Sequence, residues 1–225
     1  MKRKMNEQQL EEYWNNKYPK KDIVYGGRQI PKRDARIPVD VRKIIWCNDC
    51  IILELIKKEN IVKSSCDETA LACQQYVVKN YKYISDIESV GYTEFWQFPF
   101  ETTYLKTGDC EDGAVLMASL MCSSGIPQWR IRVNAGWALD NNNVKQGHAY
   151  VTYCRETDNN WIILDWCYRE DSSVIVKDKI IAKNNEKYVD IWFSFNSQYS
   201  FSHKNYDIFE DINDEPKTLF NGINP

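Results

Sequence analysis

The stretch that decides the fold runs from residue 108 to residue 127 and reads GDCEDGAVLMASLMCSSGIP. Asp109 stands where a helix cap is expected, acidic residues fill the next turn, and Gly125 and Pro127 mark an end. This pattern predicts a helix of about four turns. Cys110 falls in its first turn, where unpaired backbone N–H groups and the helix dipole stabilise a thiolate. Cys110 is therefore the candidate nucleophile.

Two helices are expected upstream of this stretch. Apolar residues recur at helical spacing over residues 40–59. Ser65 and Glu68 form the S-x-x-E pattern of a capping box and predict a second helix that begins near Ser65. The aromatic segment 92–104, with Pro99 inside it, predicts a structured loop.

Downstream of residue 127 the apolar period changes from that of a helix to two. Strands are expected over residues 129–135, 148–154, 161–167 and 188–195. Helices followed by an antiparallel sheet indicate the α+β class, with the N-terminal helices packed on the sheet. We expect three parts: an N-terminal arm over 1–38, one domain over 39–200 and a C-terminal tail over 201–225. The arm either packs on its own domain or docks a protein partner.

The chain has only two histidines, and one of them, His148, begins a predicted strand. The next strand carries Asp165 in an apolar run, where an acid is costly unless it is paired. Alternate residues of a strand share a face, so any hairpin register that opposes odd and even positions puts His148 and Asp165 on one face. A two-residue loop would make them directly opposed, and a longer turn would leave them diagonal. A lone strand-end histidine is more often structural, but thiol, imidazole and carboxylate together suit nucleophile, base and orienting acid.

The acids around the cysteine raise a difficulty. Negative charge nearby raises the pKa of a thiol. A working thiolate then needs His148 as an imidazolium, or the acids must point away, pair with arginine or hold a metal ion. The acids in question are Asp109, Glu111 and Asp112, and the arginines are Arg130 and Arg132.

These motifs resemble the transglutaminase-like superfamily. The resemblance rests on Gly-Asp-Cys110-Glu-Asp, on Gly-His148-Ala-Tyr-Val and on Trp-Ile-Ile-Leu-Asp165, which appear in this order over residues 96–168. The compact spacing is most similar to the bacterial transglutaminase-like cysteine proteinase branch, as is Trp96-Gln97-Phe98-Pro99. Gly113 departs from the pattern, because relatives often carry a larger residue there.

The resemblance implies a papain-like core and a Cys110–His148–Asp165 triad that cleaves or transfers acyl groups of amides through a thioester. It requires no cofactor, although some relatives bind calcium through the acids that flank the cysteine, here Asp109 and Glu111. An oxyanion needs two donors. The backbone N–H of Cys110 is one, and either the Trp96 indole or the Gln97 amide is the candidate for the other.

Composition excludes some classes of protein. A formal net charge of -3 gives no basic footprint, so we expect no nucleic-acid partner. The sequence shows neither a secretory signal nor an apolar run long enough to span a membrane, and we expect a cytoplasmic location. Eight cysteines without a signal predict reduced thiols and no disulfide framework. Cys47 and Cys50 have zinc-knuckle spacing, but further ligands at that spacing are missing, so buried thiols are the preferred interpretation.

Three functional hypotheses follow. The first is a cysteine peptidase or amidase that acts on a peptide or protein substrate. The second keeps the triad but transfers the acyl group to an amine, as a crosslinking transglutaminase. The third is a structural or assembly module on the same fold. Labelled-amine incorporation separates the first two, and selective thiol labelling separates both from the third.

Overall fold

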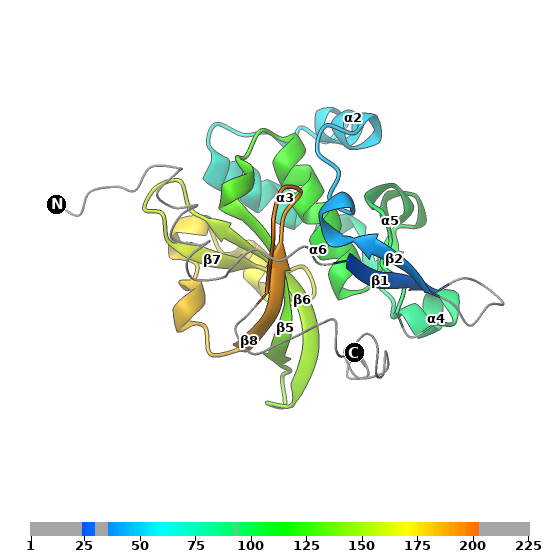
Figure 1. The fold of residues 1–225 in the computed structure, drawn as a ribbon. Helices are drawn as coiled ribbons and strands as arrows, with labels where there is room; N and C mark the ends of the chain where they lie inside the picture. Colours follow the sequence, from blue (N-terminus) through cyan, green and yellow to red (C-terminus); the bar gives the residue numbers. More distant parts are fainter. Residues whose placement is uncertain (1–23, 30–35, 93, 203–225) are drawn as a thin grey trace.

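A computed structural model describes residues 24–29, 36–92 and 94–202 (Figure 1). Most of the predicted arm and tail, residues 1–23, 30–35 and 203–225, lies outside the described residues. Within the arm, β1 (Val24–Gln29) and β2 (Arg36–Asp40) pair as a small antiparallel sheet. The arm's docking role stays a prediction.

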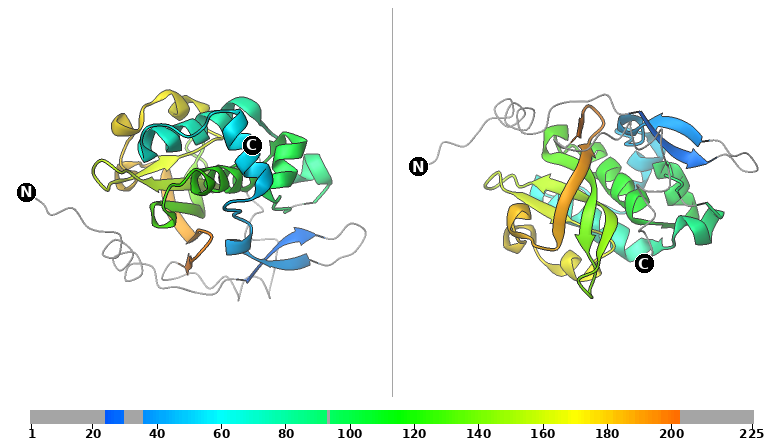
Figure 2. Two further views of the ribbon diagram at one scale, coloured as in Figure 1. Left: turned by 90° about the horizontal axis from the view of Figure 1, so that it is seen from above. Right: turned by 60° about the horizontal axis from the view of Figure 1, so that its bottom comes forward.

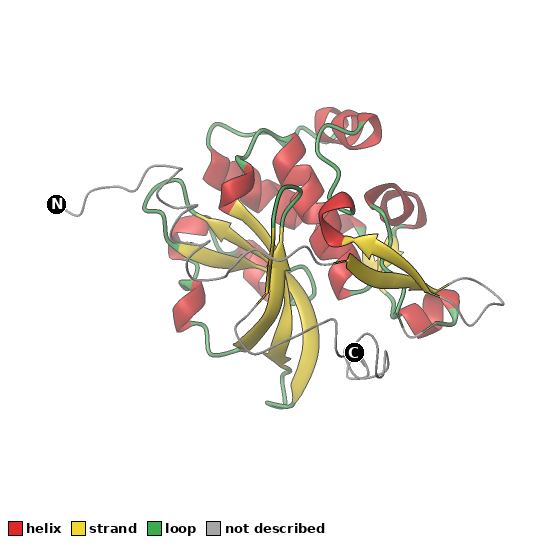
Figure 3. Cartoon of the chain, viewed as in Figure 1, coloured by secondary structure: helices red, strands yellow, loops and turns green. Residues whose placement is uncertain are grey.

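The main sheet has five antiparallel strands in the order β7-β6-β5-β8-β9 (Figures 1 and 3). They are β5 (Ile131–Leu139), β6 (Lys145–Cys154), β7 (Trp161–Leu164), β8 (Tyr188–Phe195) and β9 (Ser200–Ser202). The central strand pair is the long β5–β6 hairpin. The helices precede these strands in the chain, so the α+β prediction is confirmed.

Helix α6 (Cys110–Ser123) is the centre of the fold, and its residues 110–122 are all buried. It packs against β5 and β6 on one side and against three other helices on the other (Figure 2). Those helices are α2 (Cys50–Lys58), α3 (Cys66–Asn80) and α5 (Pro99–Leu105). A shorter helix, α4 (Asp86–Val90), lies between α3 and α5 in the sequence. Burial on all sides explains why the helix is apolar over most of its length. In the described ranges, no helix is long and apolar enough to cross a membrane.

A short parallel pair of strands sets the position of the residues before Cys110. Strand β3 (Lys82–Tyr83) pairs with β4 (Thr107–Gly108), so the chain enters α6 from a fixed point. The predicted helix near Ser65 is also confirmed, because the Ser65 hydroxyl accepts the Glu68 N–H at 3.1 Å. Capping residues therefore set the starts of α3 and α6, as the sequence predicted.

The predicted helix over 40–59 is wrong in its first half. Only Val41–Lys43 forms a short 3-10 turn there, and Asn48 has a positive φ of 62°. Helix α2 begins at Cys50, because the Asp49 carboxylate accepts the N–H of Ile51 at 2.9 Å. The helical spacing of apolar residues continues across position 49, although the Asp49 cap starts a separate helix there.

The predicted loop over 92–104 is wrong at its end, where α5 forms. Pro99 occupies the start of the helix, where its missing N–H costs nothing. The Glu101 carboxylate accepts the backbone N–H of Phe98 at 2.7 Å and closes the first turn. Proline here starts a helix and does not interrupt one.

The prediction that all cysteines are reduced is wrong for one pair. Cys47 and Cys122 form a disulfide with their Cα atoms 5.5 Å apart. This excludes Cys47 from a zinc knuckle, and Cys50 is exposed, so it is not the buried thiol that was preferred. The pairing joins residues 75 positions apart, and sequence spacing gave no sign of it. The remaining free cysteines are Cys50, Cys66, Cys73, Cys110, Cys154 and Cys167.

Candidate active site

The candidate nucleophile, Cys110, is the first residue of α6 and is 1% exposed. Its thiol lies 3.3 Å from Oε2 of Glu111, and the backbone of Ala149 on β6 lies against it. Ala149 is the residue after His148. The sulfur at the helix start and the histidine strand therefore meet at the same end of the sheet.

Trp166 fixes the backbone of this helix start. Its indole Nε1 donates to the Cys110 carbonyl at 3.1 Å. A Cβ at Gly113 would lie 2.2 Å from two atoms of the same indole. Glycine is therefore required at position 113, because Trp166 fills that space.

His148 and Asp165 form a buried pair. Nε2 of the ring lies 2.6 Å from Oδ2 of the carboxylate, and the two residues are 8% and 0% exposed. Val151 faces Leu164 in the β6–β7 register, so His148 and Asp165, one residue past β7, lie diagonally on one face. The predicted pairing is thus observed, in its diagonal form, which a turn longer than two residues requires.

Asp165 is held as an anion by several donors. Tyr188 Oη donates to Oδ2 at 2.8 Å, and the Cys167 N–H donates to Oδ1 at 2.9 Å. Burial alone would raise the pKa of Asp165, but His148 and these hydrogen bonds outweigh it and lower the pKa. The carboxylate therefore stays charged and fixes the orientation of the imidazole.

Aromatic rings surround the imidazole. Tyr168 packs edge-on at 5.3 Å between ring centroids, and Tyr150 and Tyr188 lie at 6.1 and 6.4 Å. In the part of the chain that the structure describes, no hydrogen bond joins the Cys110 thiol to the His148 ring. Hydrogen bonds of this kind are often long without substrate and tighten in the complex.

Four buried carboxylates lie beside the thiol. One oxygen from each of Asp86, Asp109, Glu111 and Asp112 lies within 4.8 Å of the others. Asp112 is partly satisfied, because its oxygens accept the N–H groups of Gln97 and Asp109 at 2.7 and 3.2 Å. One oxygen of each of the other three acids is buried without a hydrogen-bond partner.

This clustering opposes ionisation. Burial, together with the neighbouring acids, raises the pKa values of Asp109, Glu111 and Asp112 well above their usual range. Burial raises the pKa of Asp86 to about 7. Burial and the carboxylates of Glu111 and Asp109 also raise the pKa of Cys110 well above the ordinary thiol value. The difficulty expected from the sequence is therefore present in the folded protein.

The two oxyanion candidates have different environments. The Trp96 indole N–H donates to Glu94, and its ring packs on Phe193 and Phe195 in the core. Gln97 is also buried, but both polar atoms of its side chain have no hydrogen-bond partner. The Gln97 backbone N–H donates to Asp112, so Gln97 lies beside the first turn of α6.

Sequence reasoning missed three residues of this site. Asp86 joins the carboxylates from α4, and no local pattern marks it. Tyr188 reaches Asp165 from β8, although β5 and β6 lie between β8 and β7. Cys167 was placed on the strand, but its proximity to the pair was not recognised. The Tyr188 and Asp86 contacts are long-range, and the first of them depends on the sheet order.

A cysteine at the first turn of a central helix, packed on an antiparallel sheet that supplies a His–Asp pair, defines a papain-like arrangement. Residues 57–166 match the family model of the transglutaminase-like superfamily. The chain therefore carries a transglutaminase-like domain, and the resemblance stated from the motifs is confirmed.

Solved structures with a similar fold include LapG from Legionella pneumophila. The two chains are 17% identical with a TM-score of 0.52, over 68% of this chain and 86% of LapG. An EGTA-treated LapG is 18% identical with a TM-score of 0.52, over 68% of this chain and 84% of that chain. A candidate cysteine protease from Cytophaga hutchinsonii is 20% identical with a TM-score of 0.43, over 80% of this chain and 60% of that chain. At these identities the likeness concerns the fold. A comparison with curated protein sequences gives no match.

Proposed function

We propose that this chain is a thiol-dependent amide hydrolase, a cysteine peptidase or amidase, with Cys110, His148 and Asp165 as its catalytic residues. The observation that carries the proposal is the buried His148–Asp165 pair at 2.6 Å, adjacent in sequence to Ala149, whose backbone lies against the Cys110 thiol. A buried carboxylate is expensive to maintain as a structural element alone, even when it is hydrogen-bonded. Catalysis by a nucleophile, a base and an orienting acid gives a functional reason to keep this buried pair.

In this mechanism His148 accepts the thiol proton of Cys110, and the sulfur attacks the carbonyl carbon of an amide. The tetrahedral intermediate expels the amine, which takes its proton from His148, and leaves a thioester on Cys110. Water, deprotonated by the same imidazole, then attacks the thioester and releases the acid. Asp165 bonds Nε2, so the other ring nitrogen, Nδ1, is the one that would accept the thiol proton.

The negative oxygen of the intermediate needs donors that are in place beforehand. The backbone N–H of Cys110 at the helix start is one donor. Gln97 is the better second donor, because its side-chain amide is buried without a partner whereas the Trp96 indole N–H already donates to Glu94. Trp96 then serves the core.

The carboxylate cluster fits a calcium ion. Its donors are all oxygens, which is the ligand set of calcium. The buried oxygens of Asp86, Asp109 and Glu111 that lack partners would serve as ligands, and Asp112 would hold the loop at Gln97. A bound calcium would supply positive charge that offsets the acids beside the thiol. The proposed calcium ligands are thus Asp109 and Glu111, as the resemblance implies, together with Asp86.

A peptide-library digestion tests the proposal. Wild type and Cys110→Ala are compared in calcium-containing buffer, and mass spectrometry identifies new termini. We expect cleavage by wild type only. Products in which a labelled amine replaces water at the acyl group would instead favour acyl transfer. No Cys110-dependent product of either kind, together with uniform slow iodoacetamide labelling of all accessible thiols, would favour an assembly module and contradict the proposal.

A further inference from the structure

A second group of potential metal ligands lies on the imidazole side of the site. One donor atom each from His148, Asp165 and Cys167 lies within 4.8 Å of the other two. Nitrogen, oxygen and thiol sulfur together form a ligand set that suits zinc, whereas calcium takes oxygens alone. The described part of the chain thus holds two chemically different groups of ligands, one of all oxygens and one of mixed donors.

The end of β7 brings these three side chains together. Val151 on β6 faces Leu164, the last residue of β7, and Asp165 follows it directly. Cys167 lies two residues further, in the bend after the strand, with its sulfur within 4.8 Å of the ring nitrogen and the carboxylate oxygen. The Cys167 N–H also bonds Asp165 Oδ1 at 2.9 Å, which holds the cysteine next to the carboxylate.

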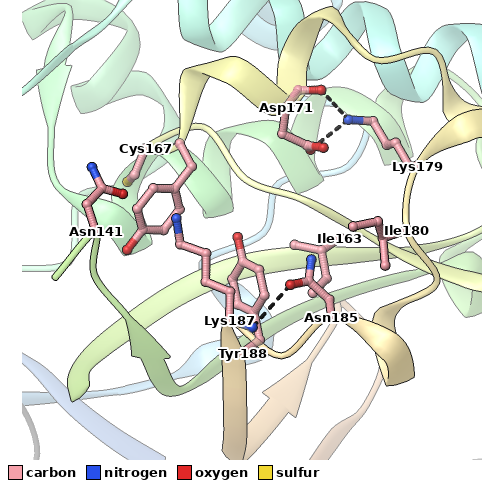
Figure 4. A pocket seen from close by; sticks show the side chains of 10 residues that line it. Asn141, Ile163, Cys167, Asp171, Lys179, Ile180, Asn185, Lys187 and Tyr188 are labelled. Atoms are coloured by element: carbon pink, nitrogen blue, oxygen red, sulfur yellow. Dashed lines mark hydrogen bonds and ion pairs between the residues drawn. The ribbon is translucent and has the colours of Figure 1, made fainter. Parts of the chain in front are cut away.

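An open cavity borders this group at Cys167. Its volume is about 430 Å³, and Cys167, Tyr168 and Tyr188 line it together with Asn141 and Lys187 (Figure 4). Cys167 is half-buried, whereas His148 and Asp165 are buried and do not line the cavity. An ion that enters from the cavity would therefore meet Cys167 first, and a water would complete a tetrahedral set with the three donors.

We propose that His148, Asp165 and Cys167 bind a zinc ion that switches the active site off. The Cys167 thiol gives its proton to solvent as the metal–sulfur bond forms. The proton on His148 Nε2 moves to Nδ1, and Nε2 donates the freed lone pair to the metal. Nε2 and Oδ2, now 2.6 Å apart, must separate by somewhat under 1 Å to serve as adjacent ligands at about 2.0 to 2.2 Å from zinc. An imidazole bound to zinc no longer accepts the Cys110 proton. Inhibition therefore rests on the proposed function, whereas metal binding does not.

Direct metal binding tests the site without any substrate. The protein, with its Cys47–Cys122 disulfide intact and saturated with calcium to fill the oxygen cluster, is titrated with Zn²⁺ by calorimetry and with Co²⁺ by absorption spectroscopy. We expect one ion per chain and a sulfur-to-cobalt charge-transfer band. Cys167→Ser should remove the band and weaken zinc binding at least about tenfold. The matched control, Cys50→Ser, changes an exposed thiol on α2 and should leave both unchanged.

A second variant protects the test against misfolding. His148→Gln removes a different ligand, and it should weaken zinc binding even if Cys167→Ser does not fold. Wild type without stoichiometric zinc, or zinc affinity unchanged in a folded Cys167→Ser or His148→Gln, would overturn the proposal.

The activity readout separates this inference from the proposed function. Zinc should inhibit wild type and Cys50→Ser, and Cys167→Ser should need at least about tenfold more zinc for the same fractional inhibition. Zinc binding that depends on Cys167 in a protein without Cys110-dependent activity would leave the metal site standing and end the hydrolase proposal. Cys110-dependent activity in a protein that binds no zinc would do the reverse.

Discussion

Gly113 and Trp166 are matched so closely that neither can change alone. The indole lies over the Cα of Gly113 and donates its N–H to the Cys110 carbonyl one turn earlier in α6. Trp166 is 1% exposed and follows Asp165 directly. One buried side chain therefore ties the nucleophile's helix to the strand end that carries the orienting acid.

Gly113→Ala should destabilise the protein by about 1 to 3 kcal/mol, the usual cost of overpacking. In an open helix the same change would stabilise by about 0.5 to 1 kcal/mol. Here the added Cβ would lie 2.2 Å from the Trp166 ring, so overlap prevails. Urea unfolding measures the loss, and Trp166→Phe in the same chain should recover part of it. A Gly113→Ala protein as stable as wild type would mean that the indole does not occupy this space.

Asp165→Ala should lower both activity and stability. The change leaves the His148 ring and the Tyr188 hydroxyl without their shared partner in a buried site. Breaking such a pair costs about 3 to 5 kcal/mol. Tyr188→Phe removes only one hydrogen bond to the carboxylate and should cost about 1 to 3 kcal/mol. Equal melting of Asp165→Ala and wild type would show that the carboxylate lies elsewhere.

The same carboxylate predicts a pH dependence of stability. Its folded pKa is lowered, so its contribution is present above the unfolded value of about 3.9 and is lost as the pH falls through the folded pKa. The difference in unfolding free energy between wild type and Asp165→Asn should therefore be large at neutral pH and shrink below about pH 4. A constant difference down to pH 2 would contradict this account.

The sequence predicted best the parts of the site that depend on local pattern. Capping residues located the starts of α3 and α6, and strand parity placed His148 and Asp165 on one face before the register was known. The sequence could not predict contacts that depend on how separate elements pack together. Tyr188 reaches Asp165 from the far side of β5, and Asp86 joins the acids from a different helix. Such contacts leave no periodic signal in a single sequence.

Calcium removal should lower the melting temperature. A ligand that binds only the folded state stabilises it by about 2.7 kcal/mol at a hundred times its dissociation constant. EGTA should remove this stabilisation. In Asp86→Asn, the calcium concentration that stabilises wild type should no longer raise the melting temperature. Glu88→Gln is the matched control, because Glu88 lies on the same short helix but is exposed. Identical melting with calcium and with EGTA would show that the cluster holds no calcium.

Cys110→Ala should abolish activity while changing stability by no more than about 1 kcal/mol. The sulfur is buried, but its one side-chain hydrogen bond is to Glu111. Its removal leaves the capped helix start unaltered. Thermal melting and the amide hydrolysis assay are measured on the same preparation. A melting temperature many degrees lower would indicate that the thiol has a packing role, and the lost activity would then say little about catalysis.

Reduction of the Cys47–Cys122 disulfide should destabilise the protein. The bond closes a loop of about 75 residues, for which the chain-entropy model gives about 4 kcal/mol. Melting with and without a phosphine reductant measures the effect, and Cys47→Ser should reproduce it in the absence of reductant. Thiol counting on the denatured, unreduced protein should find six free cysteines out of eight. Eight free thiols, with a melting temperature that does not respond to reductant, would contradict the disulfide. That result would agree with the predicted cytoplasmic location, where disulfides are rare. Six free thiols would favour folding in an oxidising compartment.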